Sequence, residues 1–342
     1  ETWGTLNAAG SNAILVCHAL TGDSHAAGTM GIGHPEEGWW DKFIGPNKPI
    51  DTNRWFVVCV NVLGGCQGST GPSSIIAGTE QRYEARFPQI TIRDIVRSQR
   101  RLADRLQINR WLAIVGGSLG GMQVLEWGIM FPERVRLLMP IATCAAASAQ
   151  QIAWSAVERL AIANDPLFNN GDYYDAPPGK GPWAGLALAR EISQITYRTP
   201  QVFDERFGRQ HIDQRCEFAP WGRYQVESYL DHHGQKLVRR FDANSYLILS
   251  KAMDLHDIGR GRGGVAAAFA RLSSEVFVAS INSDLLYPPY QQAAICQGVT
   301  AAGGRCAYEI IDSPHGHDGF LIEHELLGTA IANTLDAIER KK

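Results

Sequence analysis

The segment Ala113–Met122 constrains the fold more than any other part of the chain. It is an apolar run that passes through the pattern G-x-S-x-G, centred on Ser118, directly into helix-forming residues. Strand, glycine-flanked serine and helix in this order are typical of a nucleophile elbow, which exposes a serine hydroxyl on a sharp turn. Side chains larger than glycine beside the serine would collide with the incoming helix. The alternative is a tight glycine turn that carries an ordinary solvent-facing serine.

Strand and helix patterns alternate along most of the chain. Short, nearly continuous apolar runs predict buried strands, and an amphipathic pattern with arginines on its polar side predicts a helix. This alternation predicts an α/β protein with a mostly parallel, doubly wound sheet, the α/β-hydrolase type that the elbow also indicates. The expected strands are 12–17, 55–61, 135–141, 275–281 and 306–311, and the expected helices include 91–106, 289–298 and 319–337.

The alternation stops between about residues 145 and 256. Long helical patterns, many aromatic residues and turn-rich breaks replace it. We therefore expect a core formed by residues 1–145 and 257–342. Residues 146–256 are expected to form a helical lid, inserted over the carboxyl edge of the sheet.

Composition narrows the class of protein. The net charge of −3 gives no reason to expect a nucleic acid or an anionic membrane as a partner. No apolar run reaches the roughly 18 residues that a membrane-spanning helix needs. The seven cysteines are odd in number and lack paired spacing, which predicts reduced thiols in a cytoplasmic protein. The chain begins at Glu1 rather than Met, so an upstream targeting segment stays open.

A serine nucleophile needs a base, and the base needs an acid to hold it. In this fold the partners follow in the chain order serine, acid, histidine, each after a later strand. Asp284 is the only carboxylate where the strand 275–281 ends, and both His315 and His317 follow the strand 306–311. Each residue alone would be read as a turn or loop residue. Their joint order favours a triad of Ser118, Asp284 and one of the two histidines.

The oxyanion of an acyl-transfer intermediate needs two backbone N–H donors. One is expected from the residue after the nucleophile, Leu119. The second is expected from the loop after the strand 12–17, where Leu20 is the candidate because glycine and small residues allow a close approach.

Several motifs resemble the homoserine O-acetyltransferase family, and together they span essentially the whole chain. Members of this family usually carry a further strand pair before the position of Glu1, so N-terminal strands of the core are expected to be missing. The matching segments are His18–Ser24, Asn61–Cys66, Gly68–Pro72, Gly116–Met122, Glu126–Trp127, Arg223–Tyr224, Glu227–Leu230, Asp257–Gly264, Ser283–Asp284, Leu286–Pro288 and Gly316–Leu321.

The resemblance implies a ping-pong acyl transfer in methionine biosynthesis. Ser118 takes the acetyl group of acetyl-CoA and then gives it to the hydroxyl of L-homoserine. The family's base lies in G-H-D, which selects His317 over His315. The resemblance implies no bound cofactor or metal, only small-molecule substrates, and a homodimer formed through the lid.

The resemblance also implies a binding site for the amino-acid acceptor. Arg190 and Tyr197 would bind its carboxylate, and Asp318 its ammonium group. Seven residues apart on one helix, Arg190 and Tyr197 would share a face, and a guanidinium matches a carboxylate in shape and charge. Without the family, Arg190 would equally be a solvated charge or the partner of a nearby glutamate.

Other polar groups are expected to have structural roles. Neither Asp254, His256 and Asp257 nor the pair His232–His233 has the spacing of a zinc site, so we expect hydrogen-bonding residues where lid and core meet. Cys66 is expected to be a loop thiol rather than a nucleophile.

The glycine-rich stretch Gly259–Gly264 lacks the order of a phosphate-binding loop. We expect it to shape a loop, with Arg260 or Arg262 contacting CoA phosphates as the alternative.

Three rival functions remain open at this point. The first keeps the chemistry and changes the substrates, with succinyl-CoA as donor or serine as acceptor. The second is a plain esterase of the same fold. The third is a binding protein on a retired hydrolase scaffold, which the presence of Ser118, Asp284 and His317 makes the weakest of the three.

Overall fold

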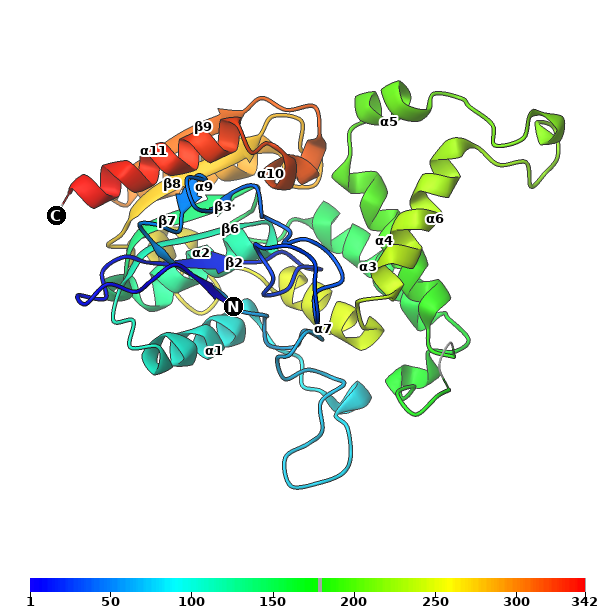
Figure 1. Ribbon diagram of the computed structural model, residues 1–342, viewed down its shortest axis with the longest axis horizontal. Helices are drawn as coiled ribbons and strands as arrows, with labels where there is room; N and C mark the ends of the chain where they lie inside the picture. The colour runs from blue at the N-terminus through cyan, green and yellow to red at the C-terminus, as the bar shows by residue number, and fades with distance from the viewer. Residues whose placement is uncertain (178–179, 342) are drawn as a thin grey trace.

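A mostly parallel seven-stranded sheet forms the centre of the computed structural model, which describes residues 1–177 and 180–341 (Figure 1). The strands lie in the order β1-β5-β2-β6-β7-β8-β9, and β1 alone pairs antiparallel. Their bounds are β1 Thr2–Trp3, β2 Ala13–Cys17, β5 Phe56–Cys59, β6 Trp111–Gly117, β7 Val135–Ile141, β8 Glu275–Ile281 and β9 Cys306–Ile311, with a separate pair β3 Ile44–Gly45 and β4 Ile50–Asp51.

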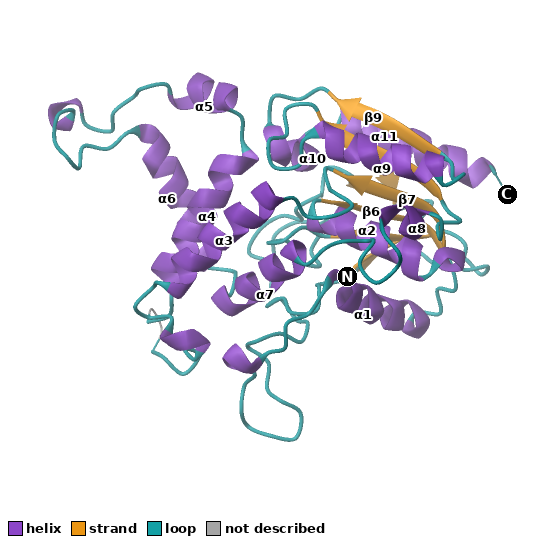
Figure 2. Ribbon diagram, turned by 180° about the vertical axis from the view of Figure 1, so that it is seen from behind, coloured by secondary structure: helices purple, strands orange, loops and turns teal. Residues whose placement is uncertain are grey.

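The central strands are buried on both faces, which accounts for their continuous apolar sequences. Helix α11 packs on one face of the sheet, and α1, α2 and α9 pack on the other (Figures 1 and 2). The core helices are α1 Ile92–Arg105, α2 Leu119–Met130, α8 Val265–Phe269, α9 Pro289–Ala301, α10 Gly319–Ile322 and α11 Leu326–Arg340. The expected α/β-hydrolase architecture is therefore confirmed.

Strand register sets the position of the serine turn. In the parallel pair of β2 and β6, Cys17 lies opposite Gly116. The loop after β2 and the turn that carries Ser118 therefore leave the sheet side by side at its carboxyl edge.

Along the chain, helices α3 to α7 follow strand β7 and precede strand β8. Helices α3 to α6 stand out beyond the carboxyl ends of the strands (Figures 1 and 2). The two ends of this insertion meet: Ala146 and Asp257 form an antiparallel bridge, and the N–H of Ile258 donates to the carbonyl of Ala145. We call these helices the lid. Their bounds are α3 Ala149–Ala163, α4 Trp183–Tyr197, α5 Pro200–Phe207, α6 Gln225–Val238 and α7 Ala243–Asp254.

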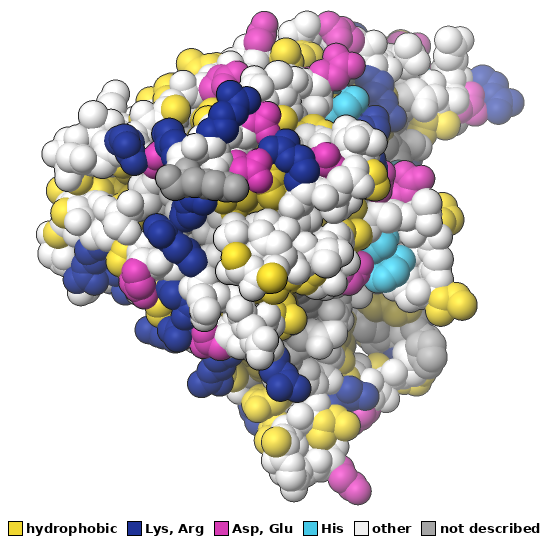
Figure 3. All heavy atoms as spheres, turned by 60° about the vertical axis from the view of Figure 1, so that its left-hand side comes forward, with side chains coloured by type: hydrophobic (Ala, Val, Ile, Leu, Met, Phe, Trp, Pro, Cys, Tyr) yellow, Lys and Arg dark blue, Asp and Glu magenta, His cyan; other side chains and the backbone are white. Residues whose placement is uncertain are grey.

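Cationic and anionic side chains are interspersed on the face of the molecule drawn in Figure 3. None of the helices within the described residues has the length and apolar character that crossing a membrane requires.

Two local expectations are wrong. The closing helix expected at 319–337 is divided into α10 and α11, because the chain leaves the helical conformation at Glu323, whose carboxylate accepts a hydrogen bond from Ser313. The expectation of reduced thiols fails for Cys296 on α9 and Cys306 on β9, which form a disulfide where this helix lies against this strand. Cys17, Cys59, Cys66 and Cys144 are free.

Candidate active site

Ser118 lies on the turn between β6 and α2 in a backbone conformation that non-glycine residues rarely adopt, with φ 58° and ψ −124°. Its neighbours must be glycine for steric reasons. A Cβ atom at Gly120 would lie 2.1 Å from the carbonyl oxygen of Cys17, and one at Gly117 would lie 2.3 Å from the Phe320 ring. The turn thus presses the start of α2 against the end of β2.

Asp284 and His317 form a buried, hydrogen-bonded pair. The Nδ1 atom of His317 lies 2.7 Å from Oδ2 of Asp284, and the backbone N–H groups of Leu286 and Tyr287 each donate to Oδ1 at 2.8 Å. A carboxylate accepts, so Nδ1 of His317 carries a proton, and the base is Nε2 when the ring carries no second proton.

The second histidine in this loop points to another group. His315 has its Nε2 atom 3.9 Å from the carboxylate of Glu323. His317, by contrast, is enclosed by three aromatic rings, with centroid distances of 5.7 Å to Tyr197, 5.1 Å to Tyr287 and 5.3 Å to Phe320. Tyr287 and Phe320 were not predicted to have a role, although both lie in motifs that carried the family resemblance.

A cavity of about 150 Å³ joins the core to the lid. Ser118, His317 and Leu20 line it from the core, and Arg190 and Tyr197 line it from the lid. Asp284 lies behind His317 rather than in the wall. The cavity also includes residues that sequence reasoning missed, among them Trp39 and Arg240.

The lid side of the cavity carries positive charge. Arg190 and Tyr197 share one face of α4, and the guanidinium lies 5.1 Å from the centre of the tyrosine ring. Within residues 1–177 and 180–341, no carboxylate forms an ion pair with Arg190. Burial raises the pKa of Tyr197 to about 12, so its hydroxyl stays protonated at neutral pH.

Asp318 also lines the cavity, and it is already paired. Its Oδ2 atom lies 3.0 Å from the guanidinium of Arg198. Arg198 was not predicted as a partner of Asp318. An ammonium group at Asp318 would therefore share the carboxylate with Arg198.

The two expected oxyanion donors lie on adjoining segments. Leu119 is the first residue of α2, where unpaired N–H groups and the helix dipole favour negative charge. Leu20 lies in the loop after β2 and lines the same cavity as Ser118.

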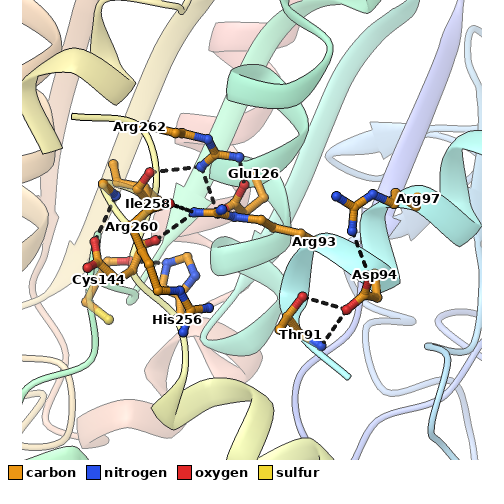
Figure 4. A network of polar contacts seen from close by, with 12 residues as sticks. Thr91, Arg93, Asp94, Arg97, Glu126, Cys144, His256, Ile258, Arg260 and Arg262 are labelled. Carbon is orange, nitrogen blue, oxygen red and sulfur yellow. Dashed lines mark hydrogen bonds and ion pairs between the residues drawn. The ribbon is translucent and has the colours of Figure 1, made fainter. Parts of the chain in front are cut away.

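Some of the polar groups expected where lid and core meet lie there, and others do not. Nε2 of His256 donates to the carbonyl of Cys144 at 3.1 Å (Figure 4), and burial lowers the pKa of His256 to about 4. His232 and His233 lie instead on α6 within the lid, where they pack against each other and His233 against Tyr229.

Arg262 does not point to a ligand site. Its guanidinium makes two contacts with the buried carboxylate of Glu126, at 2.6 and 3.0 Å, and Arg93 approaches the same carboxylate at 3.0 Å (Figure 4). The alternative that Arg262 contacts CoA phosphates is therefore wrong. Arg260 is exposed, and its carbonyl accepts from Arg93.

The remaining candidates have local explanations. Asp254 pairs with Arg159 at 2.5 Å. Burial raises the pKa of Cys66 to about 12, which keeps the thiol protonated and unreactive. Glu1, His25 and His34 each offer one possible metal-ligand atom, and these atoms lie within 4.8 Å of one another. This grouping was not predicted, because the residues are separated in the chain.

A second cavity, of about 420 Å³, adjoins the first. Both cavities are lined by Thr21, Gly22, Trp39 and Arg240. Arg240 is largely buried and donates to the carbonyl of Thr21 at 2.5 Å, and it places a cation where the two cavities meet.

Comparison with known proteins agrees with the fold. The profile of the family described as alpha/beta hydrolase fold matches residues 12–323. A homoserine O-acetyltransferase of Thermobifida fusca is 53% identical over 98% of this chain and 87% of its own length. Two solved structures, each 28% identical over 98% of this chain, are a homoserine O-acetyltransferase from Bacillus anthracis (90% of its chain, TM-score 0.90) and esterase E22 (92% of its chain, TM-score 0.89).

The chain is thus an α/β-hydrolase-fold protein with a serine elbow and a buried acid–histidine pair. It belongs to the homoserine O-acetyltransferase family, and it is an acyltransferase enzyme.

Proposed function

We propose that this enzyme transfers an acetyl group from acetyl-CoA to the hydroxyl of L-homoserine, in methionine biosynthesis. The observation that carries the proposal is one cavity shared by Ser118, His317, Arg190 and Asp318. It combines a serine and a base with a cation and a carboxylate, the charges that an amino acid's carboxylate and ammonium groups need.

The proposed reaction has two half-reactions. Nε2 of His317 takes the proton of Ser118 as its oxygen attacks the thioester carbon. The carbon–sulfur bond then breaks, and CoA leaves as a thiol with that proton. In the second half, His317 takes the proton of the homoserine hydroxyl, whose oxygen attacks the acetyl-serine, and returns it to Ser118. Asp284 keeps the imidazole in the required tautomer, and the N–H groups of Leu20 and Leu119 receive the oxyanion.

The adjoining cavities support a long acyl donor. The acetyl group would reach Ser118 in the smaller cavity while the rest of the donor occupies the larger one. Arg239 and Arg240 line the larger cavity together with four carboxylates, those of Glu1, Asp23, Glu36 and Glu37, so the support for a long donor comes from the joined volumes and not from the charge of the larger cavity.

The esterase activity is the second candidate, because esterase E22 shares this fold at a TM-score of 0.89. The acyl donor also stays open between acetyl- and succinyl-CoA, and the acceptor between homoserine and serine. A steady-state panel of acetyl-, propionyl- and succinyl-CoA against homoserine and serine separates these functions. We expect turnover with acetyl-CoA and homoserine. CoA release that is unaffected by any acceptor would establish hydrolysis, and turnover with succinyl-CoA alone would overturn the acetyl assignment.

We also propose a homodimer that forms through the lid, in the cytoplasm. Large apolar side chains of the lid support the dimer because they are exposed on the single chain, notably Ile152, Val157, Leu160, Leu188 and Ile195. Sedimentation at micromolar concentration tests it, and a purely monomeric chain would contradict it.

A further inference from the structure

Three buried side chains bind the backbone around the two expected oxyanion donors. They are His18 in the loop after β2, Gln123 on α2 and Thr143 two residues after β7. None of them lines the cavity that contains Ser118. Their hydrogen bonds show what they hold.

Thr143 fixes the peptide group that carries the N–H of Leu119. Its hydroxyl donates to the carbonyl of Ser118 at 2.8 Å. Because the carbonyl of one residue and the N–H of the next lie in one rigid plane, holding the first orients the second.

His18 fixes the peptide group that carries the N–H of Leu20. Its Nδ1 atom lies 2.7 Å from the carbonyl of Ala19, and its Nε2 atom lies 3.0 Å from the backbone nitrogen of Val62. A carbonyl only accepts and a backbone N–H only donates, so the imidazole is neutral with its proton on Nδ1. Burial, which lowers the pKa of His18, favours the same form.

Gln123 joins the two segments. Its side-chain amide nitrogen donates to the carbonyls of His18 and Leu119, each at 3.2 Å. Its Oε1 atom accepts from Gln99 at 2.6 Å, and Oε1 of Gln99 accepts from the indole N–H of Trp127 at 2.8 Å. The indole can only donate and the backbone carbonyls can only accept, so both amides have a single possible orientation.

We propose that Gln123, His18 and Thr143 are positioning residues that hold the two N–H donors of the oxyanion hole at a fixed separation. The proposal rests on the proposed function, because that function assigns the donors to Leu20 and Leu119. A hole accelerates acyl transfer only when its donors are already in place as charge develops on the oxygen. Side chains that hold both peptide planes place the two N–H donors before the substrate binds.

The test compares two acyl donors that differ in one atom, p-nitrophenyl acetate and its thiono analogue, in which sulfur replaces the carbonyl oxygen. A sulfur anion is larger and accepts hydrogen bonds weakly, so the hole favours the oxygen ester. Release of p-nitrophenolate in the first turnover reports acylation of Ser118 for both esters, without CoA or homoserine.

Two variants remove the hydrogen bonds while keeping side-chain volume. We expect Gln123→Met to lower the first-turnover rate with the oxygen ester by about 10- to 100-fold, and Thr143→Val by about 10-fold, below the loss of a whole donor. The thiono rate should change little, so the ratio of the two rates falls. Matched controls are Gln194→Met, a buried amide of the lid, and Ser274→Ala, a buried hydroxyl that donates to the carbonyl of Val135. Both controls should leave the ratio unchanged.

An unchanged ratio in folded Gln123→Met and Thr143→Val, or an equal loss with both esters, would overturn the proposal. If Gln123→Met does not fold, Gln99→Met decides in its place, because it removes the donor to Gln123 without touching either backbone segment. A wild-type chain that releases p-nitrophenolate from neither ester would overturn the assignment of the nucleophile and of the hole. A wild type that reacts with the esters but not with acetyl-CoA would overturn the proposed function alone.

Discussion

The core side and the lid side of the cavity differ in how completely their polar groups are bonded. On the core side, Asp284 uses both carboxylate oxygens, and the His317 ring is enclosed by aromatic rings. On the lid side, the Arg190 guanidinium has a tyrosine ring but no carboxylate among the described residues. The acid–histidine pair is therefore fixed by the protein, whereas Arg190, one of the three groups assigned to acceptor binding, has its charge available for a ligand.

The largest expected effect comes from removing the nucleophile on the core side of the cavity. We expect Ser118→Ala to abolish the acetyl-enzyme and to lower turnover by at least about 10⁴-fold, as is typical for loss of a nucleophile. Intact-protein mass spectrometry after mixing with acetyl-CoA measures the adduct, and Ser98→Ala on α1, outside both cavities, is the control. An adduct that persists in Ser118→Ala would place the nucleophile elsewhere.

The next effect concerns a buried ion pair within the core, between Arg262 and Glu126 on α2. Glu126 is 1% exposed, so we expect Arg262→Met to lower the free energy of unfolding by about 3 kcal/mol by leaving a buried carboxylate underpaired. Urea unfolding measures this. Arg260→Met is the matched control in the same loop, where an exposed side chain should cost less than about 0.5 kcal/mol. Equal losses in both variants would show that the Glu126 contact is not stabilising.

A third change acts on the lid side alone. We expect Arg190→Ala to raise the KM for homoserine by about 100-fold, because a bound carboxylate would lose its charged partner. The rate of acetylation by acetyl-CoA should be unchanged, and Arg215→Ala, an exposed arginine of the lid, should affect neither. An equal loss in both half-reactions would contradict the assigned role of Arg190.

The smallest expected effect is on the pH dependence of stability, and it comes from a buried carboxylate of the lid. Burial raises the pKa of Glu158 from 4.5 to about 6, although Tyr246 and Ser193 donate to its oxygens. The folded chain then binds this proton more tightly than the unfolded chain does. This contribution to stability is fully present well below pH 4.5 and is lost as pH rises through about 6, by about 2 kcal/mol in total.

We therefore expect Glu158→Gln to remove that part of the pH dependence. Urea unfolding at pH 4 and pH 7 measures it. The exposed Glu205→Gln should follow the wild type. The same change in the free energy of unfolding with pH in Glu158→Gln and in the wild type would show that Glu158 does not titrate in this range.

The sequence predicted what depends on local pattern and chain order. The strands 135–141, 275–281 and 306–311 lie where their apolar runs indicated. Because parallel strands bring their carboxyl ends to one edge, order alone placed Asp284 and the two histidines near each other. The choice of His317 over His315 needed the family resemblance.

The contacts that sequence reasoning missed depend on three-dimensional register. Gln99 and Gln123 lie on different helices, and neither residue type nor spacing shows that their amides meet. The pairings of Arg262 with Glu126 and of Cys296 with Cys306 likewise arise only when helices and loops are packed. Such pairings require knowledge of which faces touch, and one sequence does not contain it.

The bridge between Ala146 and Asp257 gives the lid both its entry and its exit at one place on the core. An insertion tethered in this way is exchangeable: recombination at two neighbouring points would replace every lid helix and leave the sheet hydrogen bonds intact. In such chimaeras the acylation machinery would be inherited from one parent and the choice of acceptor from the other.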